Sequence, residues 1–320
     1  MRNIAGAAVA SAVMICDSTA MAQHSTPHHD PDGVVLINQR DALEGYITSR
    51  DAPGFPVTIS DPGSYRLTSN LYPQREHGAI EIAADDVTID LNGFTITTDH
   101  ADGINGVSGR SNIVIRNGTI RNGSTPVNLQ FSSFVHLMQI QVYEATFAGV
   151  VLGDHASITD SSIHYNRTEG LRVGAYALIA RNVVSDNTSD GINAGNGSII
   201  EGNIVAHNQQ GIVCNFCTIT GNSVYSNDQA GIHVTNALIN NNTAFQNRGE
   251  AIWCNDASHA AGANCLIINN TVTQNNVGLL VDCPSLIREN FAYTNANNAD
   301  IAIGTETGGP CTKSGNAPPP

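Results

Sequence analysis

The chain has 320 residues and a mass of 33.7 kDa, enough for one large folded unit or two ordinary domains, and its 41% apolar content excludes a wholly disordered chain. Charged residues make up 13% and aromatic residues 5%, whereas 30 residues are glycine and 35 are asparagine, a composition that disfavours a helical bundle. The formal net charge of −14 opposes contact with nucleic acid or with an anionic membrane, and we expect neither as a partner.

The N-terminus has the layout of a secretory signal, predicted to span residues 1–22. Arg2 precedes an apolar run over residues 4–15, and small residues form a cleavage site at 20–22. The run is too short to span a bilayer, so we expect a secreted or periplasmic protein that is free of the membrane once the signal is removed. A lipid anchor at Cys16 is the alternative, and the bulky Ile15 before it speaks against that alternative.

Removal of the signal takes the cysteine count from seven to six, an even number that is typical of disulfides in an oxidising compartment. Cys254 and Cys265 bracket an apparent insertion, and a Cys283–Cys311 bridge would hold the tail. Residues 214–217 read Cys-Asn-Phe-Cys, the spacing of a redox or zinc pair. Because no second pair or nearby histidine accompanies it, we favour a structural role.

A repeat of about 20 residues dominates the chain. A Gly-Ile-x-Val motif starts at residues 170, 191, 211, 231, 251 and 278, with some substitutions, and Asn-x-Val-x-x-Asn recurs in the same register from 182–187 to 270–275. The apolar residues alternate with a period of two, so the pattern predicts coils of short strands, in which aligned residues stack in columns.

Three columns follow from this register. The first inward column is predicted to be Ile158, Ile179, Ile200, Ile219, Ile239, Ile267 and Ile287. The second is Ile163, Val184, Val205, Val224, Ala244, Val272 and Ala292. The closing column is Asn166, Asn187, Asn208, Asn227, Asn247, Asn275 and Asn295. We expect these asparagines at a turn, because Asn tolerates a left-handed backbone and stacked amides can bond to one another.

These motifs resemble the coils of the right-handed parallel β-helix superfamily, the pectate-lyase-like solenoids. Val87-Thr-Ile-Asp-Leu-Asn-Gly-Phe-Thr-Ile96 and Ile113-Val-Ile-Arg-Asn-Gly-Thr-Ile120 look like the opening coils of many exported bacterial members, and residues 54–67 look like their N-terminal strand pair. The resemblance implies an all-β fold, a right-handed parallel β-helix solenoid of about ten coils with an N-terminal cap. It also implies a polysaccharide or glycan as partner.

The predicted organisation has five parts. They are a signal peptide (1–22), a polar linker (23–33), an N-terminal cap with a short helix near 37–46 and a strand pair (34–78), the parallel β-helix (79–303) and a flexible tail (304–320).

The outward column of the Gly-Ile-x-Val strands carries the first candidate site. Successive coils lie about 5 Å apart, so Arg172 is predicted to lie beside Asn193, with Glu169 and Asp190 in the preceding turns. We predict Arg172, Glu169 and Asp190 to be catalytic and Asn193 to bind substrate. Two neighbouring carboxylates disfavour double ionisation, so the pKa of one of them can be raised. Alternatively they can hold Ca²⁺, the one expected cofactor, or be neutralised by Arg172. The alternative is that these acidic residues have no role in a site and only keep the turn solvated.

Two further clusters complete the predicted site. His233 and Trp253, the one tryptophan, share the same outward column and are predicted to bind a sugar, with the histidine also suited to proton transfer. Asp186 and His207 fall in successive coils and are predicted to be catalytic. Strand alternation points these two inward, whereas the adjacent turn can swing them out. Tyr225 is predicted to stack on a sugar, and an ordinary exposed aromatic ring is the alternative.

Two functions follow from these residues. The first is a lyase or epimerase on an acidic polysaccharide, in which a base removes the proton α to a uronate carboxyl. The second is a non-catalytic glycan-binding or surface protein. The one lysine, Lys313, lies in the tail, so a lysine base is disfavoured. The chain also lacks the Asn-Thr-Asp and Gly-His-Gly motifs of polygalacturonases, the Asp-Pro-His-Asp stretch of alginate epimerases, and the Met-rich motif of copper-site maturation proteins.

Overall fold

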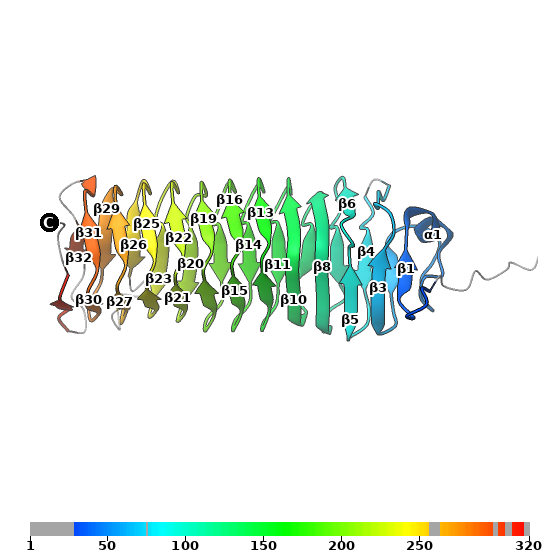
Figure 1. Ribbon diagram of the computed structural model, residues 1–320, viewed down its shortest axis with the longest axis horizontal. Coiled ribbons are helices and arrows are strands. Elements are labelled where there is room, and N and C mark those ends of the chain that lie inside the picture. The colour runs from blue at the N-terminus through cyan, green and yellow to red at the C-terminus, as the bar shows by residue number, and fades with distance from the viewer. Residues whose placement is uncertain (1–28, 75, 256–262, 297–299, 305–308, 317–320) are drawn as a thin grey trace, which may run out of the picture.

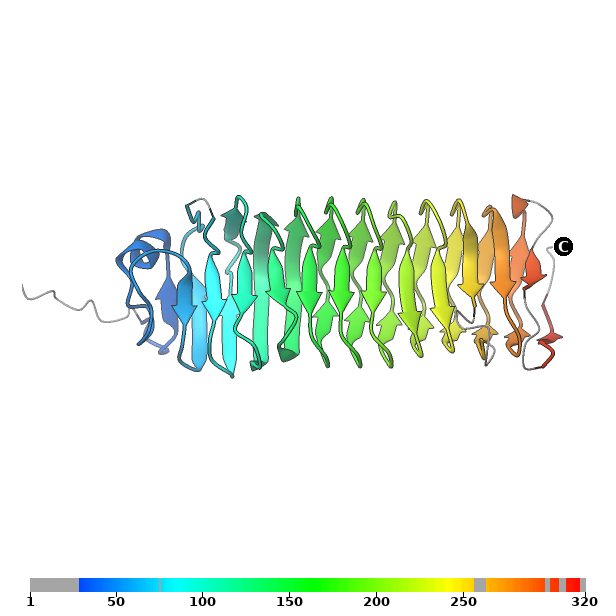
Figure 2. The same cartoon turned by 180° about the vertical axis from the view of Figure 1, so that it is seen from behind.

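The computed structural model describes residues 29–74, 76–255, 263–296, 300–304 and 309–316. Within these residues the chain winds into an elongated solenoid of parallel strands, with α1 (Gln39–Glu44) near one end and β32 (Ile301–Ile303) near the other (Figure 1). The strands form a smaller sheet of 12 strands and a larger sheet of 21 strands. The predicted all-β parallel β-helix is therefore confirmed, and the view from behind shows the same regular stacking of coils (Figure 2).

The smaller sheet takes one strand from each coil. Its strands are β2 (Val57–Ile59), β4 (Ile80–Ile82), β7 (Ile104–Gly106), β9 (Val127–Leu129), β11 (Val150–Leu152), β14 (Leu171–Val173), β17 (Ile192–Ala194), β20 (Ile212–Asn215), β23 (Ile232–Thr235), β26 (Glu250–Cys254), β29 (Val277–Val281) and β32 (Ile301–Ile303).

The larger sheet has two rows of short strands joined by a corner, and six strands of 3 to 12 residues precede them. The first strands are β1 (Val35–Ile37), β3 (Gly63–Leu67), β5 (Val87–Asp90), β6 (Thr95–Thr98), β8 (Ser111–Asn122) and β10 (Ser133–Tyr143). The first row is β12 (Ser157–Thr159), β15 (Leu178–Ala180), β18 (Ile199–Glu201), β21 (Thr218–Thr220), β24 (Leu238–Asn240), β27 (Leu266–Ile268), β30 (Leu286–Arg288) and β33 (Thr312–Ser314). The second row is β13 (Ser162–His164), β16 (Val183–Ser185), β19 (Ile204–Ala206), β22 (Ser223–Tyr225), β25 (Thr243–Phe245), β28 (Thr271–Thr273) and β31 (Phe291–Tyr293).

Both predicted inward columns form the core. Ile158 pairs with Ile179 and Ile179 with Ile200, and each is fully buried. The second column pairs in the same way, from Ile163 to Val184 and onward, and is likewise buried. Because every coil contributes an apolar residue, usually Ile or Val, to each column, the apolar side chains stack without interruption along the axis.

Two buried asparagine ladders make the corners of the coil. In the predicted ladder, Asn187 Nδ2 donates to Asn208 Oδ1 at 2.9 Å, and Asn208 Nδ2 donates to Asn227 Oδ1 at 3.2 Å. A second ladder runs in parallel between the rows of the larger sheet, where Asn203 Nδ2 donates to Asn222 Oδ1 at 3.0 Å. Each amide bonds to its neighbours and to backbone carbonyls, so these polar groups are buried without loss of hydrogen bonds.

The prediction that these asparagines adopt the left-handed backbone is wrong. The left-handed residue is the one before each Asn: Tyr165, Asp186 and His207 have φ of 55°, 56° and 57°. The tight bend falls there, which turns that side chain outward and leaves the following asparagine buried, where its amide can join the ladder.

The structure differs from the expected boundaries at both ends. Residues 54–67 contain two strands, as predicted, but β2 and β3 do not pair with each other. They lie in different sheets and pair with β4 and β5, so the solenoid begins before residue 79. The predicted flexible tail is also corrected, since β33 pairs with β30 and Asn316 accepts from Asn290 Nδ2 at 3.2 Å.

The N-terminal cap contains the expected short helix. Helix α1 (Gln39–Glu44) starts at Asn38, whose side chain accepts from the backbone N–H groups of Arg40 and Asp41. The end of the predicted linker is bound to the solenoid, because the Asp30 carboxylate pairs with Arg66 at 2.9 Å. The predicted signal, residues 1–22, and residues 256–262 of the insertion lie outside the described residues.

Replacing one ladder amide should destabilise the solenoid. Asn208→Ala removes the acceptor of two bonds from Asn187 and the donor to Asn227, and we expect the free energy of unfolding to fall by about 3 kcal/mol. Urea unfolding followed by circular dichroism measures the change. The exposed Asn196→Ala is the matched control, and equal stability of the two variants would contradict the role of the ladder.

Candidate functional site

The outward column of the smaller sheet brings the first predicted residues together. Arg172 in β14 pairs with Asn193 in β17, which pairs with Val213 in β20. The column continues through His233 in β23 to Trp253 in β26. The register read from the sequence is therefore confirmed for this face, and five coils present it as one surface.

Asp190 is the best-placed titratable carboxyl on this face. Its Oδ2 accepts a hydrogen bond from Asn193 Nδ2 at 3.0 Å. Burial raises the pKa of Asp190, the nearby Glu169 raises it further, and the bond from Asn193 partly opposes both. Arg172 Nη1 lies 3.9 Å from Glu169 Oε1, and the Arg172 side chain is 53% exposed, so its guanidinium can still receive an anion.

His233 and Trp253 form the second part of this face. Their rings stack with centroids 4.2 Å apart and planes 8° apart. His233 Nδ1 lies 2.9 Å from Gln210 Oε1 and Nε2 lies 3.1 Å from Asn255 Oδ1. Burial lowers the pKa of His233, and the contact with Asn255 and the nearby Asp190 and Glu250 oppose that effect. The imidazole covers one face of the indole.

The predicted pair Asp186 and His207 lies on a different face. Each residue directly follows a strand of the second row, β16 or β19, on the other side of the asparagine turn from Asp190, and the left-handed backbone swings both side chains outward. His207 Nδ1 lies 3.8 Å from Asp186 Oδ1. Tyr225 stacks on Phe245 with centroids 4.7 Å apart and meets His207 edge-on at 6.0 Å. The predicted catalytic residues thus divide between two faces.

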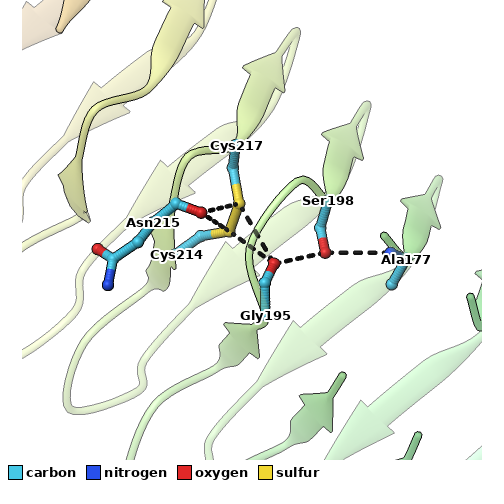
Figure 3. The surroundings of a disulfide bond; sticks show 6 residues. All are labelled: Ala177, Gly195, Ser198, Cys214, Asn215 and Cys217. Carbon is cyan, nitrogen blue, oxygen red and sulfur yellow. Dashed lines mark hydrogen bonds between the residues drawn. A yellow bond between two sulfur atoms is a disulfide. The ribbon is translucent and has the colours of Figure 1, made fainter. Parts of the chain in front are cut away.

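The six cysteines that follow the predicted signal form three disulfides, and these include the expected Cys283–Cys311 bridge. They join Cys214 to Cys217, Cys254 to Cys265 and Cys283 to Cys311. Figure 3 shows the first, which closes the turn after β20 next to the Gly195 carbonyl, while Ser198 Oγ donates to that carbonyl at 2.7 Å. The two sulfur-bearing residues are 2% and 3% exposed, so the pair staples the solenoid turn, as the structural interpretation predicted.

Metal binding by Glu169 and Asp190 stays a prediction. Glu169 lies one coil before Asp190, since the Gly170 N–H donates to the Asp190 carbonyl, but Asp190 already accepts from Asn193. Among the described residues, no group of three or more His, Cys, Asp or Glu side chains is arranged to hold a metal ion.

Sequence reasoning did not assign two contributors to this surface. Gln210 and Asn255 contact the two ring nitrogens of His233. Gln210 directly precedes Gly211, the same place in the repeat that Glu169 and Asp190 occupy, and this was the available signal for it. A second omission is a column of aromatic residues at the far end of the smaller-sheet strands. Phe134, His155 and Tyr176 recur at the spacing of the repeat, and that spacing was the available signal.

Comparison with known proteins supports the fold. The family described as "Right handed beta helix region" matches residues 153–295. The chain is similar in structure to the mannuronan C-5 epimerase AlgE4 A-module of Azotobacter vinelandii, with a TM-score of 0.65, 15% identity and coverage of 80% of this chain and 87% of that one. It is also similar to the periplasmic alginate epimerase AlgG, with a TM-score of 0.55, 13% identity and coverage of 89% and 83%.

A third similar structure is the Dettilon tailspike protein, with a TM-score of 0.50, 14% identity and coverage of 82% of this chain and 60% of that one. Among curated proteins, no sequence matches this chain. At these identities the likeness establishes a right-handed parallel β-helix fold, and any activity has to be argued from the residues of the site. No helix in the described part of the chain is long and apolar enough to cross a membrane.

Neutralising Asp190 should stabilise the protein at pH 7. The folded-state pKa of Asp190 is raised above the ordinary value of 3.8, so ionisation disfavours the folded state, and stability is lost as the pH rises through that raised pKa. We therefore expect Asp190→Asn to have a higher Tm than the wild type at pH 7, with the gain disappearing below about pH 4.

The matched control for this comparison is Asp228→Asn. Asp228 is 63% exposed and pairs with Arg248 at 2.7 Å, so its replacement should leave the Tm nearly unchanged. A wild type that is as stable at pH 7 as Asp190→Asn would contradict the burial of that charge.

Proposed function

We propose that this right-handed parallel β-helix protein is exported and acts on an acidic polysaccharide, at the face of the smaller sheet that carries Arg172, Asp190 and Asn193. The observation that carries the proposal is one rigid face on which Asn193 bonds to Asp190, a carboxyl with a raised pKa, and pairs with the strand that carries the exposed guanidinium of Arg172. Perturbed carboxyls next to anion-binding groups are typical of proton-transfer sites. Structural likeness to polysaccharide epimerases supports the class of substrate.

Arg172 would receive the uronate carboxylate of the substrate. Its guanidinium offers several N–H donors in one plane, and Asn193 lies directly beside it in the paired strand. Neutralising this carboxylate stabilises the negative charge that develops when the adjacent carbon loses its proton.

Asp190 is the proposed proton-transfer group. As the carboxylate it takes the proton α to the uronate carboxyl, and the electrons of that C–H bond pass into the carboxyl group. In a lyase these electrons then form a double bond as the glycosidic C–O bond breaks, and the leaving oxygen takes the proton that Asp190 removed. In an epimerase a water molecule reprotonates the carbon from the opposite face, and Asp190 returns its proton to the solvent. A raised pKa makes Asp190 a stronger base than an ordinary carboxylate.

His233 and Trp253 would contact the neighbouring sugar unit. The pair lies on the second and third coils after Asn193 in the same column, about 10 to 15 Å along the axis. The stacked rings form one rigid aromatic surface, held by Gln210 and Asn255. A pyranose can pack against such a surface while its hydroxyls bond to the amides.

The chain departs from alginate epimerases in its catalytic motif. It has no Asp-Pro-His-Asp stretch, so the roles proposed for Arg172 and Asp190 depend on their own geometry. The export part of the proposal depends on the layout of residues 1–22 and on three disulfides, which form in oxidising compartments.

A second candidate function is non-catalytic glycan binding. It is favoured by one observation, that both nitrogens of His233 are held by side-chain amides, as in a site built to bind rather than to transfer protons. Asp186 and His207, with Tyr225, would serve the same function on the larger sheet, and calcium at Glu169 and Asp190 would act as a structural bridge to an acidic glycan.

The test is turnover of a uronan panel of polymannuronate, polyguluronate and polygalacturonate, with and without Ca²⁺. Lyase activity appears as the ultraviolet absorbance of an unsaturated uronate, and epimerase activity as exchange of the α-proton with solvent deuterium. We expect Asp190→Asn to lower kcat by about 100-fold or more. Arg172→Ala should raise KM and also lower kcat, because Arg172 both binds the substrate carboxylate and stabilises the charge that develops on it. The wild-type rate should fall at acidic pH with a pKa above the 3.8 of an ordinary aspartate.

Asp228→Asn is again the control and should retain wild-type turnover. Binding of a uronan without turnover or proton exchange, unchanged by Asp190→Asn, would replace the catalytic proposal with the binding one.

A further inference from the structure

One edge of the smaller sheet carries an exposed column of aromatic residues. The edge is the turn that leads from each smaller-sheet strand to the first row of the larger sheet. The backbone N–H groups of Phe134, His155 and Tyr176 donate to the carbonyls of Asp154, Ala175 and Asn196 on the next coil. These three residues therefore stand above one another, and we call this set, together with Phe131 and Phe216, the aromatic edge.

The rings of the aromatic edge are both stacked and open to solvent. Phe134 and His155 have centroids 4.8 Å apart, and His155 and Tyr176 have centroids 5.3 Å apart. Exposure remains high all the same, at 64% for Phe131 and Tyr176, 58% for Phe216 and 47% for Phe134. Stacking thus fixes the orientation of the rings without removing them from water, which suits a surface that meets a ligand.

The backbone at this turn does not favour aromatic residues. Phe134, His155, Tyr176 and Phe216 have φ between 52° and 59°, the left-handed region that bulky side chains rarely adopt. Gly197 stands in the same column with φ of 74°, so the fold accepts a residue without a side chain there. Four aromatic residues at an unfavourable and exposed position are not accounted for by packing of the core.

A hollow of about 250 Å³ opens beside the aromatic edge. Its lining includes Phe131, Gln130, Ser133 and Asp154. Asp154 Oδ1 accepts from the Ala175 N–H at 2.8 Å, which holds the carboxylate at the rim. An aromatic ring next to amide, hydroxyl and carboxylate groups is the composition that sugar rings require, since the ring receives the C–H face and the polar groups receive the hydroxyls.

The Cys214–Cys217 disulfide fixes the far member of this edge. Phe216 lies between the two bridged residues, and the adjacent turn is held by the bond from the Ala177 N–H to Ser198 Oγ at 3.1 Å (Figure 3). A covalent bridge across a turn limits the conformations of the residue at its tip. Phe216 is therefore presented to solvent in a defined position rather than on a loose loop.

We propose that the aromatic edge and its hollow form a second glycan-binding site, which holds a sugar ring of the polysaccharide away from the catalytic face. The site takes the uncharged face of a pyranose against Phe131 and the stacked rings, with its hydroxyls bonded to Gln130 and Asp154. Phe131 and Phe134 lie on coils that precede Arg172 toward the N-terminus, and the short strands of the smaller sheet separate the edge from Asp190. The choice of an acidic polysaccharide as the ligand rests on the proposed function.

The experiment measures binding of polymannuronate and polygalacturonate to the full chain by affinity gel electrophoresis and calorimetry. Phe131→Ala and Tyr176→Ala are expected to weaken binding about three- to tenfold each, whereas Tyr176→Phe retains it. Matched controls come from the opposite edge, where Phe147 and Tyr165 are 59% and 60% exposed. Tyr165 also shares the left-handed backbone, with φ of 55°. Phe147→Ala and Tyr165→Ala should change affinity less than twofold, with all variants compared for Tm.

The outcomes separate the two proposals. Wild-type affinity in Phe131→Ala and Tyr176→Ala, equal losses in the opposite-edge variants, or no binding of either polymer by the wild type would each overturn the second site. Asp190→Asn is expected to lose turnover and keep its affinity within twofold. If Asp190→Asn keeps turnover while the aromatic-edge variants lose affinity, the catalytic proposal fails and the second site stands.

Discussion

The asparagine ladders set the geometry on which every surface of this protein depends. A solenoid coil has to turn sharply at its corners, and each turn leaves backbone N–H and carbonyl groups without a partner in the sheets. Buried amides such as Asn187 and Asn208 bond to the backbone and to each other from coil to coil. The ladders therefore fix both the corner and the register, and the register decides which outward residues become neighbours.

The register of the coils could be predicted from the sequence because the length of the repeat determines which residues stack on one another. Residues that recur every 20 or 21 positions must stack if the strands are parallel, and the pairing of Arg172 with Asn193 follows directly. Periodicity does not report the φ angle of each residue within a turn. For this reason the sequence predicts the left-handed backbone at Asn187, whereas the structure has it at Asp186. It also does not reveal which side chains reach across coils, as Gln210 and Asn255 do to His233.

The candidate chemistry follows from unequal burial along one rigid column. Asp190 and His233 are buried enough for their pKa values to move in opposite directions, upward for the acid and downward for the base. Arg172 remains exposed on the coil before them. A regular scaffold thus places three different environments within about 15 Å along its axis, because the depth of each side chain varies while the backbone spacing does not.

The ladders also have a direction. In each step the amide nitrogen donates toward the C-terminus, so the side-chain dipoles of the ladder that contains Asn187 and Asn275 all point the same way. The last donor, Asn295 Nδ2, meets the Asp300 carboxylate at 2.8 Å. A negative charge therefore closes the positive end of the row, much as an acidic residue closes the N-terminus of an α-helix. Asp300 gives the solenoid an electrostatic terminus, which marks where the stacking of coils in this ladder stops.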